Sequence, residues 1–399
     1  MPKRKVITTE LCCGCKVCEQ KCPKGAIIMK PDQEGFWYPY VDMKKCIGCD
    51  MCVNICPENH QSFSGKSQMC ICYYNLDYNK QMQYSSGGAF IKICKAFIGN
   101  CNTYAIYGAT LTNENVVKHI KIESLSDIGC LSRSKYVQSD TEGIYKEVQY
   151  DLDRNVKVIF SGTPCQVQAL KNYLGRDYDN LLLIDFVCHG VPSPLAYKKY
   201  CDSIEKKYSK KIAKVLFRYK SRVGKNRSWD TQGIYILFDD GTNYSGSSYQ
   251  DIYMRAFLNE LLARPSCGEC KFVGLNRISD LTLGDFWGIE EKYFNKSIQN
   301  TAGTSMILVN TTRGNQVIKN IEKELSNEVF EYVDINIGVD KNIPLRKSIP
   351  PNSLRKTFYR NLLKNRWSFE ECYDQTFYPR GNIFKRILRK ISRILFENR

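Results

Sequence analysis

Residues 12–23 read CCGCKVCEQKCP, and residues 46–57 read CIGCDMCVNICP. Both stretches follow one spacing, C-x2-C-x2-C-x3-C-P. Three thiolates at this spacing on a curling loop can point at one centre, and the fourth cysteine lies beyond their reach. The proline that follows withholds a backbone donor and stops the chain from continuing as a helix. The eight cysteines in the pattern are Cys12, Cys15, Cys18, Cys22, Cys46, Cys49, Cys52 and Cys56.

This spacing is typical of bacterial two-cluster ferredoxins, in which the fourth cysteine of each run ligates the other cluster. It predicts two [4Fe–4S] clusters and an electron-transfer role. One cluster would be held by Cys12, Cys15, Cys18 and Cys56, and the other by Cys46, Cys49, Cys52 and Cys22. Cys13 fits neither frame and is interpreted as a bystander. Zinc suits evenly stepped triplets poorly, and disulfides need an oxidising compartment.

Composition bounds the remaining possibilities. The chain has 399 residues, 20 cysteines and a formal net charge of +17, which predicts two or three domains. Without a run of 18 apolar residues or an apolar N-terminal stretch, we expect a cytoplasmic protein. The positive charge would suit nucleic acid, a membrane surface or an acidic partner. No ordered basic–aromatic motif is present, so nucleic-acid binding is not predicted.

The chain after the cysteine runs alternates strand and helix patterns. Apolar runs at 104–109, 156–160 and 181–187 predict strands, and helical spacing follows at 89–100 and 166–174. This is the order of βαβ units, whose ligands bind beyond the carboxyl ends of the strands. Further strands are predicted at 233–239 and 281–283. The predicted fold class is an α+β ferredoxin-like domain followed by a larger mixed α/β domain and a basic amphipathic C-terminal helix.

Six segments in order resemble the coenzyme F-420 hydrogenase/dehydrogenase beta-subunit family. They are SSGGAF (85–90), RSKYVQSD (133–140), SGTPCQVQAL (161–170), DFVCHGVPSP (185–194), CGECKF (267–272) and DLTLGDFWGI (280–289). The last Cys–Pro pair places a two-cluster domain at 1–62, and the polar stretch after it predicts a linker at 63–84. The resemblance implies a flavin domain at 85–360, which leaves a tail at 361–399. It also implies bound FAD, with coenzyme F-420 as a substrate that exchanges hydride. No G-x-G-x-x-G fingerprint is present.

The resemblance places flavin contacts in three segments. The first is Ser86, Gly87 and Gly88, where backbone N–H groups could approach a pyrophosphate. The second is Ser134, Lys135 and Tyr136. The third is Thr163, Pro164 and Gln166, at a strand-to-helix turn. A helix cap, a solvated loop and a tight turn, respectively, are the alternative interpretations.

Four further cysteines are candidates for a third [4Fe–4S] cluster: Cys165, Cys188, Cys267 and Cys270. Zinc at a four-cysteine site and unrelated buried cysteines are the alternatives. Three residues are catalytic candidates. His189 is a candidate proton donor or flavin contact, and Asp285 and Trp287 lie in a segment that resembles a family signature near the active site.

Residues 382–399 alternate apolar and basic residues at helical spacing. This pattern predicts a basic amphipathic helix on an anionic membrane surface, or one docked on the protein or a partner subunit. The predicted function is an iron–sulfur flavoprotein oxidoreductase, with a redox partner protein or enzyme subunit. The alternative is a non-catalytic electron-transfer subunit that serves a membrane-associated polysaccharide-biosynthesis enzyme. The predicted location is the cytoplasm, with peripheral attachment to the inner face of the membrane as a further expectation.

Overall fold

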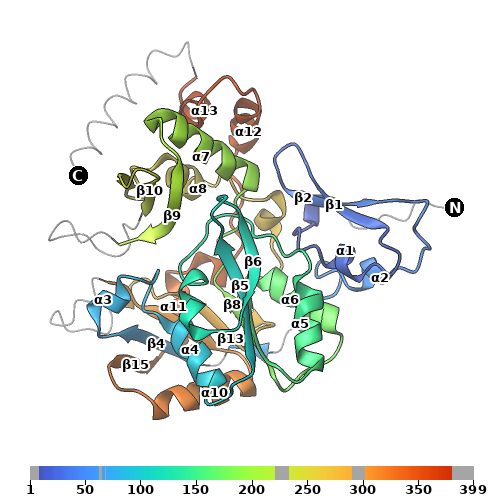
Figure 1. Ribbon diagram of the computed structural model, residues 1–399, viewed down its shortest axis with the longest axis vertical. Coiled ribbons are helices and arrows are strands. Elements are labelled where there is room, and N and C mark those ends of the chain that lie inside the picture. The colour runs from blue at the N-terminus through green and yellow to red at the C-terminus, as the bar shows by residue number, and fades with distance from the viewer. Residues whose placement is uncertain (1–8, 63–64, 68, 221–232, 290–301, 380–399) are drawn as a thin grey trace.

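The fold combines a large central sheet, a second lobe and an N-terminal unit (Figure 1). The computed structural model describes residues 9–62, 65–67, 69–220, 233–289 and 302–379. In Figure 1 the second lobe lies above the central sheet, and the N-terminal unit projects to the right. The predicted helix at 382–399 lies outside the described residues.

The central sheet has eight strands in the order β15-β4-β14-β13-β8-β7-β5-β6. Strands β5, β7, β8 and β13 run parallel, and the remaining neighbours pair antiparallel. The bounds in sheet order are Glu328–Val333, Met69–Asn75, Ser305–Val309, Leu281–Asp285, Leu181–Phe186, Lys157–Gly162, Tyr104–Leu111 and Val117–Ile122.

Helices cover both faces of this sheet, because side chains alternate along each strand. In β7, Ile159 packs toward α4 (Ala89–Ile98) and α10 (Thr312–Lys323). Its neighbours Val158 and Phe160 pack on the other face, against α5 (Ile144–Asp153) and α6 (Pro164–Leu174). On that second face α11 (Ile335–Asp340) packs near β4 and β14. The predicted βαβ arrangement and the mixed α/β class are confirmed by β7, α6 and β8.

The second lobe is built on a small antiparallel sheet in the order β11-β10-β9. These strands are Asn243–Gly246, Gly233–Phe238 and Ile212–Tyr219. They share one apolar core with the four helices α7 (Pro194–Tyr208), α8 (Ile252–Leu258), α12 (Arg355–Leu362) and α13 (Phe369–Phe377).

The N-terminal unit contains the hairpin β1 (Ile27–Pro31) and β2 (Trp37–Val41) with the short helices α1 (Val17–Lys21) and α2 (Met51–Asn54). It is joined to the main body by buried contacts. The Thr141 hydroxyl and the Tyr145 hydroxyl both donate to the Cys15 carbonyl, at 2.8 Å and 3.0 Å. Phe36 is fully buried in the core of the second lobe.

Two expected boundaries differ from the structure. Residues 63–84 were expected to be a linker, but β4 lies inside the central sheet between β15 and β14, and α3 (Tyr78–Gln81) follows it. The expected tail at 361–399 overlaps the folded body, because α13 contributes buried Phe369 and Cys372 to the core of the second lobe. Both segments are held by partners distant in sequence, which local polarity does not reveal.

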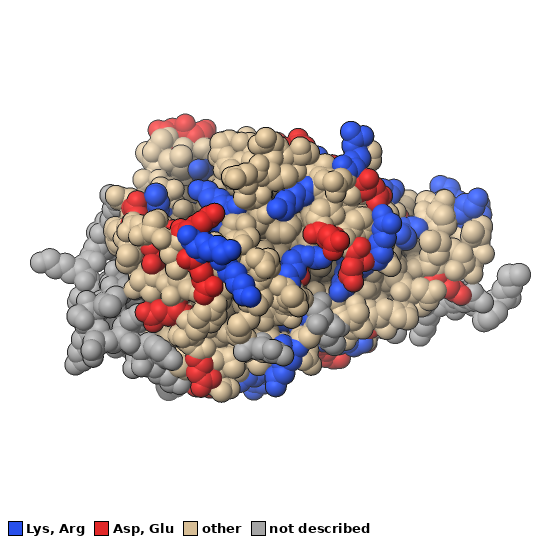
Figure 2. Space-filling view, turned by 90° about the horizontal axis from the view of Figure 1, so that it is seen from below, with Lys and Arg blue, Asp and Glu red and all other residues tan. Residues whose placement is uncertain are grey.

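Surface charge is mixed on the face that Figure 2 shows. Lys and Arg side chains lie among Asp and Glu side chains over that face, with broad neutral areas between them. Within the described ranges, none of the helices has the length and apolar character needed to cross a membrane.

Candidate functional site

The first cysteine group joins the start of the chain to Cys56. Cys12, Cys15, Cys18 and Cys56 are buried, and we call them the inner ferredoxin set. Burial raises the pKa of Cys18, and the charges of Cys12 and Cys56 raise it further, so these thiols lie close together. The Gly14 amide donates to the Cys12 sulfur at 3.4 Å. Thiolates are the ligands that a cubane cluster takes, and the assignment of these four cysteines to one cluster stays a prediction.

The second group is Cys22, Cys46, Cys49 and Cys52, called here the outer ferredoxin set. Burial raises the pKa of Cys52, and the charges of Cys22 and Cys46 act in the same direction. Cys46 and Cys49 are exposed. Both runs share one backbone pattern: φ is +69° at Gly14 and Gly48, +60° at Lys16 and +57° at Asp50. The repeat in sequence is therefore a repeat in loop geometry.

The remaining four candidate cysteines also come together. Cys165 is the second residue of α6, just after β7, and Cys188 follows β8. Cys267 lies in the 3-10 turn Pro265–Glu269, and Cys270 is the residue that follows this turn. We call Cys165, Cys188, Cys267 and Cys270 the rim set. Burial raises the pKa of Cys188 well above its usual value, and the charges of Cys267, Cys165 and Cys270 add to the rise. The structure thus brings together four thiols, the first and last of which, Cys165 and Cys270, are 105 residues apart in the sequence.

Parallel strands explain why the rim set forms. Gly162 at the end of β7 lies opposite Asp185 near the end of β8, so Cys165 and Cys188 leave the same edge of the sheet. Gly190 has φ +115°, and a Cβ at this position would stand 3.4 Å from the Cys267 Cβ. Among the described residues, no three His, Cys, Asp or Glu side chains are grouped closely enough to hold a single metal ion.

Cys13 does not behave as a bystander. The pKa of its thiol is raised well above the usual value, chiefly by its interaction with Cys15 of the inner ferredoxin set, while its interaction with Cys165 of the rim set opposes the rise. Its carbonyl accepts from the Gln138 side chain at 3.0 Å. Cys13 therefore lies between two cysteine groups, a position that its place outside the spacing pattern does not reveal.

Two of the three predicted flavin-contact segments meet beside four basic side chains. The Ser134 amide donates to the Ser85 hydroxyl at 2.8 Å, which joins the SSGG turn to the SKY segment. The Ser86 hydroxyl donates to the Thr304 carbonyl at 2.6 Å, and the Gly87 amide donates to the Ser305 hydroxyl at 2.9 Å. The neighbouring cations form what we call the basic cluster: Arg133, Lys135, Arg218 and Lys220.

Burial sets the protonation of the two lysines in this cluster. It lowers the pKa of Lys135 to about 7 and the pKa of Lys220 to about 7. The Lys135 ammonium donates to the Ser132 carbonyl at 2.7 Å. The Lys220 ammonium donates to the carbonyls of Gln81 and Ser86, each at 2.9 Å. Both ammonium groups are positioned by neutral main-chain carbonyls, which do not balance their positive charge. An anionic ligand bound beside them would balance it.

Arg218 connects the basic cluster to two of the catalytic candidates. It is a bulged residue in β9, where Tyr219 pairs with Gly233 and Phe217 pairs with Ile234. Its φ is +55°, and such a bulge re-aims a side chain. The guanidinium lies 2.7 Å from the Asp285 carboxylate and 5.2 Å from the centre of the Trp287 ring. Asp285 ends β13, beside β8, so these residues occupy the same sheet edge as the rim set.

Tyr136 and His189 extend this arrangement toward α8. The centre of the Phe257 ring lies 4.7 Å from the centre of the Tyr136 ring and 5.3 Å from the centre of the His189 ring. His189 Nε2 lies 2.5 Å from the Glu260 carboxylate. Phe257 therefore contacts the rings of both His189 and Tyr136, while Asp285 and Trp287 adjoin the basic cluster.

The third predicted contact segment forms a helix cap. Thr163 and Gln166 make a capping box at the start of α6, with Pro164 at its first turn. The Gln166 amide also donates to the Ser139 hydroxyl at 3.0 Å, and Ser139 hydrogen-bonds to His119. The Thr163 hydroxyl lies 3.1 Å from the Cys165 sulfur. This segment therefore adjoins the rim set and forms a tight, capped turn, and its contact with a flavin stays a prediction.

A cavity of about 490 Å³ lies elsewhere, in the second lobe. It is lined by residues of α7, α8 and α13, among them Tyr200, Arg255 and Tyr373. None of the predicted site residues lines it. The cysteine groups and the basic cluster therefore remain the candidate site.

Sequence reasoning missed Arg133, Arg218 and Lys220 of the basic cluster. Arg133 and Arg218 both have positive φ, +70° and +55°, which is uncommon for residues other than glycine. Arg133 directly precedes the SKY segment, so its position was a signal that the contact segment extends one residue further. Arg218 and Lys220 follow an ordinary strand pattern and carry no motif.

Two family models match this chain. The model for the C-terminal part of the beta subunit of coenzyme F-420 hydrogenase/dehydrogenase matches residues 155–334. The model for a 4Fe-4S dicluster domain matches residues 11–60. The first match spans β7, β8 and β13, which position the rim set and Asp285, and the second spans the inner and outer ferredoxin sets.

Among solved structures, the chain is similar to one from the F-420-reducing NiFe hydrogenase complex of Methanosarcina barkeri, solved as a xenon derivative. The two are 14% identical with a TM-score of 0.43, and the match covers 78% of this chain and 91% of the other. No curated protein matches. On these two matches, residues 155–334 form a domain of the coenzyme F-420 hydrogenase/dehydrogenase beta-subunit family, and residues 11–60 form a 4Fe-4S dicluster domain.

Proposed function

We propose that the protein passes electrons between a hydride carrier and [4Fe–4S] clusters, with FAD bound at the basic cluster. The coarser statement follows from the matched families: the chain is an iron–sulfur electron-transfer subunit related to the beta subunits of F-420 oxidoreductases. The proposal adds the flavin, a third cluster at the rim set and reduced coenzyme F-420, or a substitute, as the hydride carrier.

The observation that carries the proposal is the shared sheet edge. Asp285 at the end of β13 pairs with Arg218 of the basic cluster, while Cys188 follows the neighbouring strand β8. The rim set in turn adjoins the inner ferredoxin set through Cys13. A two-electron site and a series of one-electron sites would therefore lie next to one another.

The residues present fit an anionic dinucleotide. Lys135 and Lys220 provide buried ammonium groups, and the SSGG turn brings main chain near them through the Ser86 carbonyl. Trp287 provides an aromatic face beside Arg218 of the same basic cluster. A flavin exchanges two electrons with a hydride carrier and single electrons with a cubane cluster, which is the conversion that the proposed function needs.

The residues of the chain would have separate roles. The basic cluster would hold the phosphates, and its low-dielectric surroundings would strengthen each charge-assisted hydrogen bond. Asp285 would keep the Arg218 guanidinium oriented. The rim set would receive single electrons at the sheet edge, and the inner and outer ferredoxin sets would lead them to a partner subunit at the exposed Cys46 and Cys49.

The test is to purify the full chain anaerobically and measure flavin, iron and acid-labile sulfide per chain. We expect one FAD and three clusters. Reduced F-420, NADH and NADPH should then be added in separate samples. We expect the flavin absorbance to bleach only with the donor that the protein uses physiologically. A Cys188→Ala variant should lose one cluster of the three and keep its flavin.

Two outcomes would contradict the proposal. A Cys188→Ala protein with the iron content of the unchanged protein would remove the rim set as a cluster site. Full iron content without flavin would instead favour the alternative, an electron-relay subunit with no hydride reaction of its own.

A further inference from the structure

Arg264 is a buried cation at the junction between the N-terminal unit and the main body. It immediately precedes the 3-10 turn that carries Cys267, and its side chain is 1% exposed. Its Nε donates to the Cys12 carbonyl at 2.6 Å, and its two terminal nitrogens donate to Gln138 at 3.2 Å and to the Trp37 carbonyl at 2.8 Å. All three acceptors are neutral oxygens.

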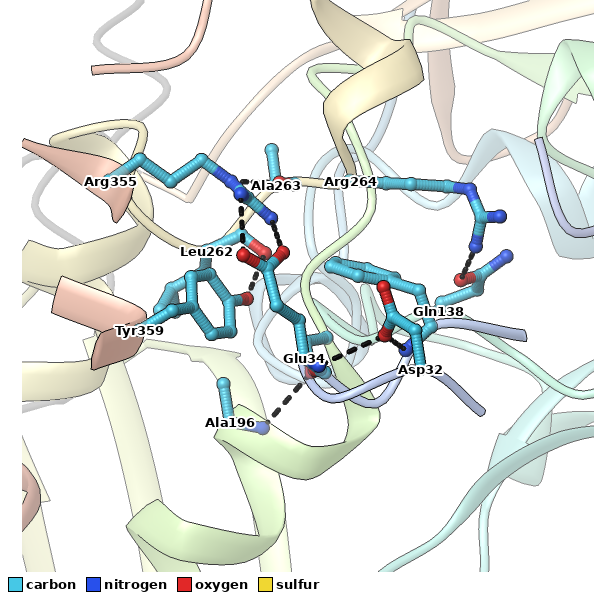
Figure 3. A network of polar contacts seen from close by, with 11 residues as sticks. Asp32, Glu34, Gln138, Ala196, Leu262, Ala263, Arg264, Arg355 and Tyr359 are labelled. Atoms are coloured by element: carbon cyan, nitrogen blue, oxygen red, sulfur yellow. Dashed lines mark hydrogen bonds and ion pairs between the residues drawn. The ribbon is translucent and has the colours of Figure 1, made fainter. Parts of the chain in front are cut away.

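A second arginine at the same junction has a conventional partner. Arg355 makes a two-pronged contact with the Glu34 carboxylate, with Nη1 3.1 Å from Oε1 and Nη2 bonded to Oε2. Figure 3 shows Arg355 directed at Glu34, and Arg264 extending away from that carboxylate toward Gln138. The two guanidinium groups therefore differ in charge compensation although both are buried.

The part of the chain that the structure describes offers Arg264 no carboxylate within ion-pair distance. Glu58 is near enough to be influenced by its charge, but Glu58 has its own cation, Lys271, at 3.9 Å. Burying an uncompensated charge is costly, so buried charges are usually paired. The neutral hydrogen bonds satisfy the guanidinium N–H groups without balancing the charge.

Two cysteine groups surround this cation. Burial raises the pKa of Cys12, and the Arg264 charge opposes that rise. The same charge acts on Cys267, whose pKa burial raises to about 11. Gly14 shows how close the guanidinium lies to the first cysteine loop, because a Cβ there would stand 2.7 Å from Nη1.

A cubane cluster with four thiolate ligands carries net negative charge, and its reduction adds more. The net charge near a cluster is one of the factors that set its potential. We propose that Arg264 is the shared counter-charge of clusters held by the inner ferredoxin set and the rim set, and that it raises the reduction potentials of both. This inference rests on the proposed function, because it requires both clusters.

The experiment is an EPR-monitored reductive titration of the anaerobically purified full chain with dithionite and mediators. In Arg264→Gln, the ratio of reduced to oxidised cluster at a fixed potential should fall about tenfold for two of the three clusters. For a one-electron couple this corresponds to a midpoint about 59 mV lower. The cluster of the outer ferredoxin set is the internal control and should not move. Arg264→Lys should retain most of the wild-type potential.

A second variant tests the charge without removing the arginine. Gln138→Glu places a carboxylate of nearly the same shape against the guanidinium, and it should lower the same two potentials. This variant keeps the inference falsifiable if Arg264→Gln does not fold. The control is the double variant Glu34→Gln/Arg355→Gln, which removes junction contacts while leaving the net charge unchanged. Because the Arg355 charge acts on Cys267 of the rim set but not on Cys12, the control is read at the cluster of the inner ferredoxin set, whose potential should stay in place.

The inference is overturned if three clusters assemble and neither Arg264→Gln nor Gln138→Glu moves a potential. It is also overturned if Arg264→Lys shifts them as far as Arg264→Gln, since that pattern indicates a purely structural role. If the wild-type protein holds only two clusters, both the rim cluster of the proposed function and the role of Arg264 as a counter-charge shared by two clusters are overturned. The iron and sulfide content of the wild-type protein identifies this outcome before any variant is titrated.

Discussion

At the scale of single residues, Lys135 and Lys220 are cations in surroundings that oppose their charge. Burial is the main cause of each lowered pKa, and the Arg133 charge adds to both shifts. Cys130 opposes the shift of Lys135, and Asp285 opposes that of Lys220. Between about pH 7 and 10.5 the unfolded chain binds these protons more strongly than the folded chain, so unliganded stability rises with pH across that window.

An anionic ligand reverses this preference because it binds the ammonium form. We expect the affinity of the flavin-depleted protein for FAD to fall as the pH rises above about 7, by up to about tenfold per pH unit for each lysine. Titration with FAD between pH 6 and 9, followed by flavin fluorescence, measures this slope. Lys135→Met should flatten it, and Lys95→Met, at an exposed position, should not. An unchanged slope in Lys135→Met would contradict a phosphate contact at this residue.

Residue-level prediction succeeded where spacing carries chemistry. The eight ferredoxin cysteines repeat one pattern, and the model for a 4Fe-4S dicluster domain matches the residues that contain them. Arg218 and Arg264 carry no such pattern. Arg218 reaches Asp285, which lies 67 residues away in sequence, only because a bulge in β9 turns its side chain. Arg264 lies before an ordinary Pro-Ser pair, and its burial follows from the docking of the N-terminal unit.

At the scale of elements, the strands that coincide with apolar runs in the sequence were predictable, and strand β4 was not. The runs at 104–109, 156–160 and 181–187 are strongly apolar and correspond to β5, β7 and β8, although β5 continues through Gly108 to Leu111. Strand β4 pairs instead with β14 and β15, which lie far downstream. Its polar flanks resemble a linker, and only the non-local pairing makes it a strand.

The SSGG turn next to β4 is an element whose geometry requires glycine. A Cβ on Gly87 would lie 2.2 Å from the Tyr73 carbonyl oxygen of β4 and 2.9 Å from the Ser305 amide of β14. Both neighbours are backbone in a paired sheet, so neither can easily move. We expect Gly87→Ala to reduce the free energy of unfolding by about 1–3 kcal/mol, the usual range for overpacking, and to weaken FAD retention.

Thermal unfolding of the purified variants measures the first effect, and extracted flavin per chain measures the second. Gly129→Ala is the matched control, because a Cβ there meets no atom within 4 Å. Equal stability of the two variants would show that the turn adjusts without cost.

At the scale of the whole molecule, the N-terminal unit is part of the folded body. The cysteine motifs identify this unit from the sequence but do not show how it docks. The docking uses Phe36, which is fully buried in the core of the second lobe, and Gly35, where a Cβ would stand 2.3 Å from the Leu195 Cβ of α7. The Ser193 hydroxyl donates to the Glu34 carbonyl in the same place. The hairpin turn is therefore held by the second lobe as well as by its own strands.

This docking predicts that damage to the hairpin turn spreads into the second lobe. Phe36→Ala should lower the free energy of unfolding by about 3–5 kcal/mol through loss of buried contacts, and should increase hydrogen exchange in α7 (194–208) and α12 (355–362). Tyr40→Ala, on the same hairpin but with Tyr40 54% exposed, should leave both unchanged. A tethered domain that folds alone would confine the exchange increase to residues 9–62. Hydrogen exchange followed by mass spectrometry of anaerobic samples distinguishes the two outcomes. If α7 and α12 of Phe36→Ala stay as protected from exchange as in the wild-type protein, the N-terminal unit folds independently of the second lobe and the prediction is wrong.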